Sequence, residues 1–251
     1  MIQISRAIAT FLILFFVASH AYSQDSRKPA DFEVLDTSKR YHYSMVKTLD
    51  GEIVEDSEMV LQYLGQKHGE NLHNYLFEYI VGDDEYLMVF TQMITDRASY
   101  TYGFVNPDTL EVDVDEEWFI DLKSPLKPGT KWSFSLLYPG KPKVIEHEEL
   151  RYSFELEISQ WRETFELGDL EFHNCFDVEQ SGSSEKHFTL HCDEQSVEGA
   201  IVRMNITRTY CLGHGAVLEK AEQFVEKRGI RLESCSLFSY VSELIKTEDV
   251  P

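Results

Sequence analysis

Short segments in which apolar and polar residues alternate recur along most of the chain, and they constrain its fold more than any other feature. The clearest example has Tyr152, Phe154, Leu156 and Ile158 separated by single polar or charged residues. A period of two places the apolar side chains on one face of a strand. Turn-forming sequences separate such segments at residues 49–51, 82–85, 106–109 and 139–142. The pattern predicts an all-β fold, an antiparallel curved sheet that forms an incomplete or closed barrel of about ten to twelve strands.

One segment, residues 216–228, fits two secondary structures. Its apolar residues also recur at helical spacing, and Gly229 stands where a helix would end: Val217, Leu218, Ala221, Phe224 and Val225. We expect a strand over residues 216–222, because the neighbouring segments are strands. A helix remains the alternative.

The N-terminus resembles a cleaved secretory signal. Residues 1–23 carry one charged side chain, Arg6, followed by the apolar run 7–17 and by small residues at Ala21 and Ser23. We expect cleavage near Ser23 and Gln24, and a secreted or periplasmic protein. An uncleaved membrane anchor is the alternative, but the run is shorter than the roughly 20 residues that a spanning helix needs.

The remaining chain shows no internal repeat and no long linker. Residues 24–40 are polar and contain Pro29, so we expect a flexible leader there. We expect a single β-rich domain over residues 41–245 and a tail over residues 246–251. No other apolar run is long enough to span a membrane, which predicts a soluble mature protein.

The acidic composition restricts the partners. The formal net charge is −21, and the charges are spread along the chain. Such a field repels nucleic acids, so we expect no nucleic-acid partner. The oligomeric state is left open.

Four cysteines follow the predicted signal peptide: Cys175, Cys192, Cys211 and Cys235. An even number in an exported chain suggests two disulfides, with three alternative pairings. A Cys175–Cys192 bridge would join one hairpin, but the apolar residues favour a register in which Phe176 faces Leu190 and the two thiols lie on opposite faces. A bulge would be needed, so the pairing stays open.

The same region concentrates residues that bind metals. In the register just described, His191 lies opposite Cys175 and Asp193 lies opposite His173, on the outer face. These four residues define a candidate transition-metal site, which a metal-dependent or hydrolytic enzyme could use. The usual metal-binding spacings are missing, as are the common catalytic motifs. We therefore expect no cofactor and favour a protein that is not an enzyme.

Aromatic residues are abundant, with 13 Tyr, 16 Phe and 3 Trp. A curved sheet of this size can leave an apolar interior that holds one ligand. The candidate binding residues are Tyr75, Tyr86, Phe90, Tyr102, Trp118, Trp132 and His214. We expect the His214 ring to be exposed, because it lies between two glycines.

Three stretches resemble signposts of uncharacterised bacterial cell-envelope domains: residues 125–132 (PLKPGTKW), 170–178 (LEFHNCFDV) and 210–219 (YCLGHGAVLE). The resemblance covers roughly residues 118–225. It implies a curved antiparallel sheet or incomplete barrel, distantly like the periplasmic lipoprotein carriers. His214 and Cys211 depart from the usual pattern, and the resemblance supplies no site residue.

The sequence therefore favours an exported binding or assembly protein of the cell envelope. Its concave aromatic face would hold an apolar ligand or a partner segment, that is, a hydrophobic small molecule, a lipid or an envelope protein. The enzyme described above is one alternative, and a purely structural surface module is another.

Overall fold

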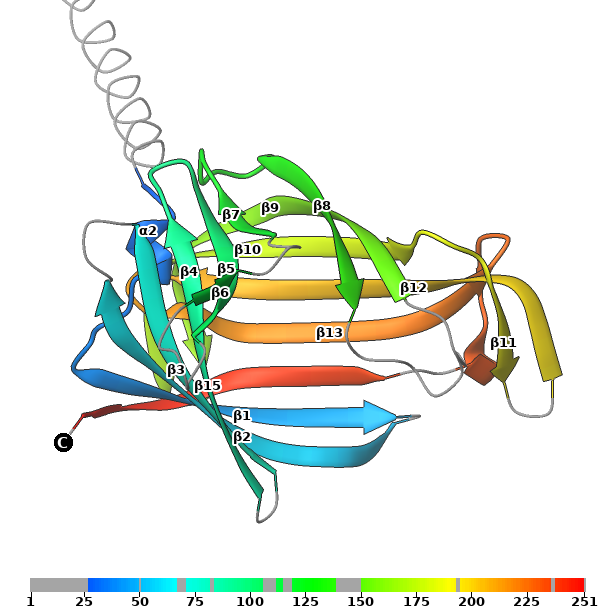
Figure 1. Ribbon diagram of the computed structural model, residues 1–251, viewed down its shortest axis with the longest axis horizontal. Coiled ribbons are helices and arrows are strands. Elements are labelled where there is room, and N and C mark those ends of the chain that lie inside the picture. Colours follow the sequence, from blue (N-terminus) through cyan, green and yellow to red (C-terminus); the bar gives the residue numbers. More distant parts are fainter. Residues whose placement is uncertain are drawn as a thin grey trace, which may run out of the picture.

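The computed structural model describes residues 27–49, 51–66, 71–81, 84–105, 112–114, 119–138, 150–192, 195–235 and 238–250. Almost all of these residues are in strands (Figure 1). The elements are α2 (Ala30–Glu33), β1 (Lys39–Leu49), β2 (Glu52–Gln66), β3 (Leu72–Val81), β4 (Asp84–Ile94), β5 (Ala98–Val105), β6 (Val112–Val114), β7 (Ile120–Lys123), β8 (Lys131–Tyr138), β9 (Leu150–Leu167), β10 (Leu170–Ser184), β11 (Phe188–Cys192), β12 (Gln195–Cys211), β13 (Gly215–Lys227), β14 (Ile230–Arg231), the 3-10 turn Glu233–Cys235 and β15 (Ser239–Asp249).

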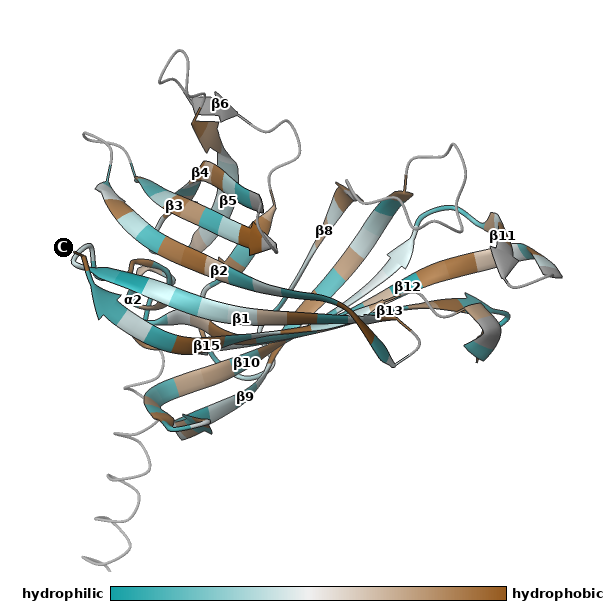
Figure 2. Cartoon of the chain, turned by 90° about the horizontal axis from the view of Figure 1, so that it is seen from below, coloured by the Kyte–Doolittle hydropathy of each residue, from teal (hydrophilic) through white to brown (hydrophobic). Residues whose placement is uncertain are grey.

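The strands form one antiparallel sheet, in the order β6-β5-β4-β3-β2-β1-β15-β13-β12-β10-β9-β8. Figure 2 shows β1, β15 and β13 in the middle of a trough, with β3–β5 rising on one side and β8 on the other. Strand β7 pairs with β5. It also contacts β8, where the Trp132 indole nitrogen donates a hydrogen bond to the Ile120 carbonyl of β7 at 3.0 Å. The sheet is thus nearly closed into a barrel, and the predicted fold class is confirmed.

The ambiguous segment 216–228 is a strand as far as Lys227. β13 pairs with β12 on one side and with β15 on the other. Its fully buried residues include Val217, Ala221 and Val225, which are four residues apart. A spacing of four falls on one face of a strand and also on one face of a helix, which explains why the pattern fitted both.

The ends of the domain extend beyond the predicted boundaries. Phe32 and Leu35, from the segment predicted as a flexible leader, are 0% and 5% exposed and belong to the hydrophobic core. At the other end, β15 continues through most of the predicted tail, and Asp249 pairs with Lys39. Residues 32–40 and 246–249 are therefore part of the same packed structure.

The disulfide pairing differs from the hairpin alternative. Cys175 is bonded to Cys211, because β10 and β12 are neighbours and these two residues lie directly opposite each other. The prediction that Phe176 faces Leu190 is wrong, since Phe176 pairs with Tyr210 and β11 pairs with β12. Among the described residues no cysteine is free, and Cys235 is also disulfide-bonded.

Gly182 is a position where the sheet requires the absence of a side chain. It lies on β10 directly opposite Phe154 of β9, whose buried ring covers it. A Cβ atom at Gly182 would overlap that ring. We expect Gly182→Val to lower the free energy of unfolding by about 1–3 kcal/mol, because overpacking forces Phe154 out of its rotamer. Urea denaturation would measure the loss; Ser181→Val, at the exposed neighbouring position, is the control and should change little.

Candidate functional site

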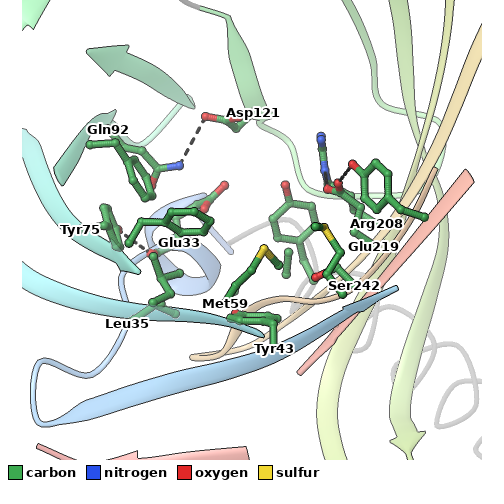
Figure 3. A pocket seen from close by; sticks show the side chains of 18 residues that line it. Glu33, Leu35, Tyr43, Met59, Tyr75, Gln92, Asp121, Arg208, Glu219 and Ser242 are labelled. Atoms are coloured by element: carbon green, nitrogen blue, oxygen red, sulfur yellow. Dashed lines mark hydrogen bonds and ion pairs between the residues drawn. The ribbon is translucent and has the colours of Figure 1, made fainter. Parts of the chain in front are cut away.

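A cavity of about 400 Å³ lies between α2 and the inner faces of β1–β4, β7, β12, β13 and β15 (Figure 3). This volume is within the range of about 300–1,000 Å³ that small-molecule sites occupy. Aromatic side chains supply much of its wall, namely Tyr43, Tyr75, Phe77, Phe90, Tyr210 and Tyr240. Met45, Met59 and Leu61 add flexible apolar surface. The walls therefore suit an apolar ligand.

Two carboxyl groups, from Glu33 of α2 and Asp121 of β7, line the same cavity. Glu33 is 8% exposed and accepts a hydrogen bond from the Ser99 hydroxyl at 3.2 Å. Asp121 accepts from the Thr101 hydroxyl at 3.1 Å and from the Gln92 amide at 3.5 Å. All of these donors are uncharged groups.

Burial changes the acidity of both carboxyls. The loss of hydration, together with the charge of Asp121, raises the pKa of Glu33 to about 8. Burial likewise raises the pKa of Asp121 to about 6, although Arg208 acts in the opposite direction. Perturbed acids in a cavity are typical of functional sites, although structural networks also produce them.

Arg208 of β12, the cationic residue that lines the cavity, already forms an ion pair. Its Nε forms an ion pair with Glu219 of β13, which also accepts from the Tyr240 hydroxyl, and its Nη1 donates to the Gln180 side chain at 3.1 Å. Burial alone would lower the pKa of Arg208, but Glu219 and the neighbouring phenols raise it above its usual value. Arg208 therefore stays charged, with Glu219 as its counter-ion.

Of the residues predicted to bind a ligand, Tyr75 and Phe90 line this cavity. Their rings stack at a centroid distance of 5.0 Å, and the Tyr75 hydroxyl donates to the Glu33 carbonyl at 2.7 Å. Tyr86 lies elsewhere on β4 and is 57% exposed, and Trp132 is buried in the core. Tyr102 is half-buried on β5 and is not part of the lining, while Trp118 is outside the described residues.

His214 is half-buried, which differs from the predicted exposure. Its ring packs edge-on against Phe172 and Tyr41, at centroid distances of 5.1 and 6.5 Å. Burial lowers the pKa of His214. The residue belongs to the packed end of the sheet beside the turn between β12 and β13.

The strand register predicted to bring the candidate metal ligands together is not observed, because His191 pairs with Ser196 and Cys175 pairs with Cys211. Cys175 is held in the disulfide, so it has no thiolate to offer a metal. The His173 side chain is 64% exposed and lies 3.3 Å from Glu171. The side chains of His191 and Asp193 are outside the described part of the chain. Within that part, no group of three or more His, Cys, Asp or Glu residues converges on a metal position.

Sequence reasoning missed Glu33, Asp121, Arg208 and Glu219. The alternation of inward and outward residues along β12 and β13 could have indicated Arg208 and Glu219. Ile206 and Tyr210 are buried on the inner face of β12, so alternation places Arg208 on that face as well. On β13, the buried residues Val217 and Ala221 place Glu219, which lies between them, on the inner face as well. Charged residues at inward positions therefore pointed to this site.

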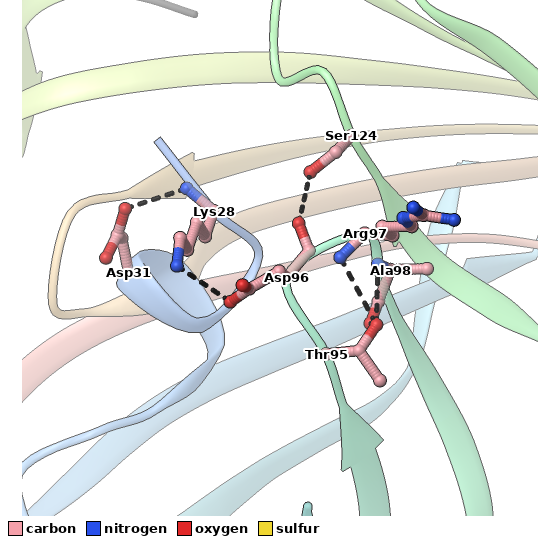
Figure 4. A network of polar contacts seen from close by, with 7 residues as sticks. All are labelled: Lys28, Asp31, Thr95, Asp96, Arg97, Ala98 and Ser124. Atoms are coloured by element: carbon pink, nitrogen blue, oxygen red, sulfur yellow. Dashed lines mark hydrogen bonds and ion pairs between the residues drawn. The ribbon is translucent and has the colours of Figure 1, made fainter. Parts of the chain in front are cut away.

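A second cavity, of about 640 Å³, lies beside the start of α2 and is lined by four cationic side chains, Arg27, Lys28, Arg97 and Lys123. Figure 4 shows the contacts around it: Lys28 pairs with Asp96 at 2.8 Å, and the Ser124 hydroxyl donates to the Asp96 carbonyl at 3.0 Å. The side chains of Lys28 and Asp96 are 50% and 76% exposed. Water screens such charges, so the first cavity is the stronger candidate for a specific site.

Comparisons with known proteins identify no family. No protein-family model matches the chain, and no curated protein does. One similar solved structure, described as "a putative lipoprotein" from Parabacteroides distasonis ATCC 8503, has 10% identity and a TM-score of 0.40, covering 85% of this chain and 96% of that one. Another, described as "a putative exported protein with YmcC-like fold" from Bacteroides fragilis NCTC 9343, has 12% identity and a TM-score of 0.40, covering 86% and 97%. Likeness at this level carries no argument about function.

Among the described residues, none of the helices is long and apolar enough to cross a membrane.

Proposed function

We propose that this protein is an exported, non-enzymatic binding protein whose cavity beside α2 holds a small molecule with an apolar body. The observation that carries the proposal is a cavity of ligand size with aromatic and methionine walls. Export is supported by the signal-like N-terminus and by the Cys175–Cys211 disulfide, since such bonds persist in oxidising compartments.

The shape of the wall supports the binding of a small molecule in preference to a flat partner surface. Its residues come from eight strands and from α2, so they surround the space on several sides. Burial of an apolar ligand there removes apolar surface from water, at about 25 cal/mol per Å². The methionine side chains can adapt to ligands of somewhat different shape.

A variant that fills the cavity tests this proposal. Leu61 of β2 lines the cavity, whereas Leu64 of the same strand is 48% exposed. We expect Leu61→Trp to weaken binding of the neutral dye N-phenyl-1-naphthylamine at least about tenfold, equivalent to about 1.4 kcal/mol, because the indole occupies the space. Dye fluorescence measures the affinity.

The matched control is Leu64→Trp, which should bind the dye like the wild type. Native mass spectrometry of protein purified from its own host should show a bound small molecule that Leu61→Trp lacks. Equal dye binding by all three proteins, or no binding by any of them, would refute the proposal.

A further inference from the structure

We propose that the ligand of this cavity is an organic cation, an ammonium group on an apolar body, and that Glu33 supplies its counter-charge. The inference rests on the proposed function and adds the chemical class of the ligand. The cavity contains three carboxyl groups and one guanidinium: Glu33, Asp121, Glu219 and Arg208.

Among the described residues, two of these carboxyls have no cationic partner. Glu219 neutralises Arg208 through their ion pair. None of the ion pairs among the described residues includes Glu33 or Asp121, whose hydrogen-bond donors are hydroxyl and amide groups. A buried carboxylate without a cation is costly, and a cationic ligand would relieve that cost.

Five aromatic side chains line the same cavity as Glu33, namely Tyr43, Tyr75, Phe90, Tyr210 and Tyr240. Aromatic faces attract cations within about 6 Å, and cages of such rings are a common way to bind quaternary ammonium groups. The aromatic wall and the free carboxyls therefore favour the same ligand charge.

The same groups disfavour an anion. Glu219 already neutralises Arg208, so an incoming carboxylate would have to share the guanidinium with Glu219 or displace it. Displacement would break an ion pair whose two side chains are each only 21% exposed, which is unfavourable. The incoming anion would also face Glu33 and Asp121.

Binding of a cation should be linked to release of a proton. The charged and titratable groups that face Glu33 are Tyr43 of β1, Tyr75 of β3, Asp121 of β7, Arg208 and Tyr210 of β12, Glu219 of β13 and Tyr240 of β15. Burial and the neighbouring Asp121 raise the pKa of Glu33 to about 8. Glu33 is then largely protonated at pH 6 and largely ionised at pH 8.5, so the cation should bind more tightly at the higher pH.

Three probes with the same alkyl chain separate charge from apolar contact: octyltrimethylammonium, 1-octanol and octanoate. We expect the wild type to bind octyltrimethylammonium at least about tenfold more tightly than 1-octanol at pH 8.5, with the preference falling towards pH 6. The charge of a quaternary ammonium does not depend on pH, so the change reports on the protein. Competition with N-phenyl-1-naphthylamine measures all three affinities.

Glu33→Gln should reduce the preference for octyltrimethylammonium over 1-octanol to less than about threefold. Asp121→Asn provides an independent variant with the same expected direction. The control Glu163→Gln removes one charge from an exposed position of β9 that does not line the cavity and should retain the wild-type preference.

The outcomes separate the two proposals. Equal binding of all three probes by the wild type would overturn the cation preference and leave the binding function standing. A preference for octanoate would also overturn it and would identify Arg208 as the docking group. Failure of every probe to bind would refute the proposed function together with the inference.

Discussion

Replacing Cys175 and Cys211 together by alanine should lower the free energy of unfolding by about 2–5 kcal/mol. The disulfide joins residues separated by 36 positions, and the chain-entropy relation gives about 4 kcal/mol for a loop of that length. Both cysteines are 0% exposed and pack in the core with Tyr41 and Phe172, so lost packing adds to the effect. Urea denaturation without reductant, monitored by circular dichroism, measures the change in the free energy of unfolding.

Unfolding of the wild type in the presence of reductant tests whether the loss of stability comes from the missing disulfide bond. Reduction opens the same bond together with that of Cys235, so the reduced wild type should be no more stable than the oxidised double variant. A double variant within about 1 kcal/mol of the oxidised wild type would contradict this prediction. The β10–β12 pairing would then hold without the bond.

The strands could be predicted from the sequence because their signal is local. Tyr152, Phe154, Leu156 and Ile158 alternate with polar residues, and all four are buried on β9. The disulfide could not be predicted in this way, because it depends on which strands are neighbours. β11 lies off the main order of the sheet, so β10 is the neighbour of β12 and Cys175 meets Cys211. The positions of the cysteines in the sequence could not decide among the three pairings.

The candidate site shows the same limit more strongly. Glu33 lies in a short polar segment that carries no strand or helix pattern of its own, and its burial depends on Phe32 and Leu35 packing into the core. Those contacts form only once the sheet has curved around α2. Tyr75 and Phe90 were found as candidates because a curved aromatic sheet predicts an apolar wall, whereas the charges inside it come from four separate segments.

Glu33→Gln should make the protein more stable than the wild type, and the gain should grow as the pH rises from 6 to 8 and level off above pH 8. The pKa of Glu33 is about 8 in the folded protein and near 4.5 without burial. Between these values the folded state holds one more proton than the unfolded state, so the free energy of unfolding falls as pH rises. The slope is about 1.4 kcal/mol per pH unit well below pH 8 and falls to about half of that at pH 8, which gives about 2 kcal/mol between pH 6 and pH 8.

Glutamine keeps the size of the side chain and cannot ionise, so this slope should be absent from the variant. Asp121, whose pKa is about 6, titrates at the lower end of this range, but it is present in both proteins, so the difference between them reports on Glu33. Chemical denaturation of wild type and Glu33→Gln at pH 6, 7 and 8 gives the difference, and Glu163→Gln corrects for the general loss of negative charge. Parallel curves for wild type and Glu33→Gln would mean that Glu33 is already ionised at pH 6. The cavity would then bind cations with no dependence on pH, and the proton linkage would have to be abandoned even if the charge preference remained.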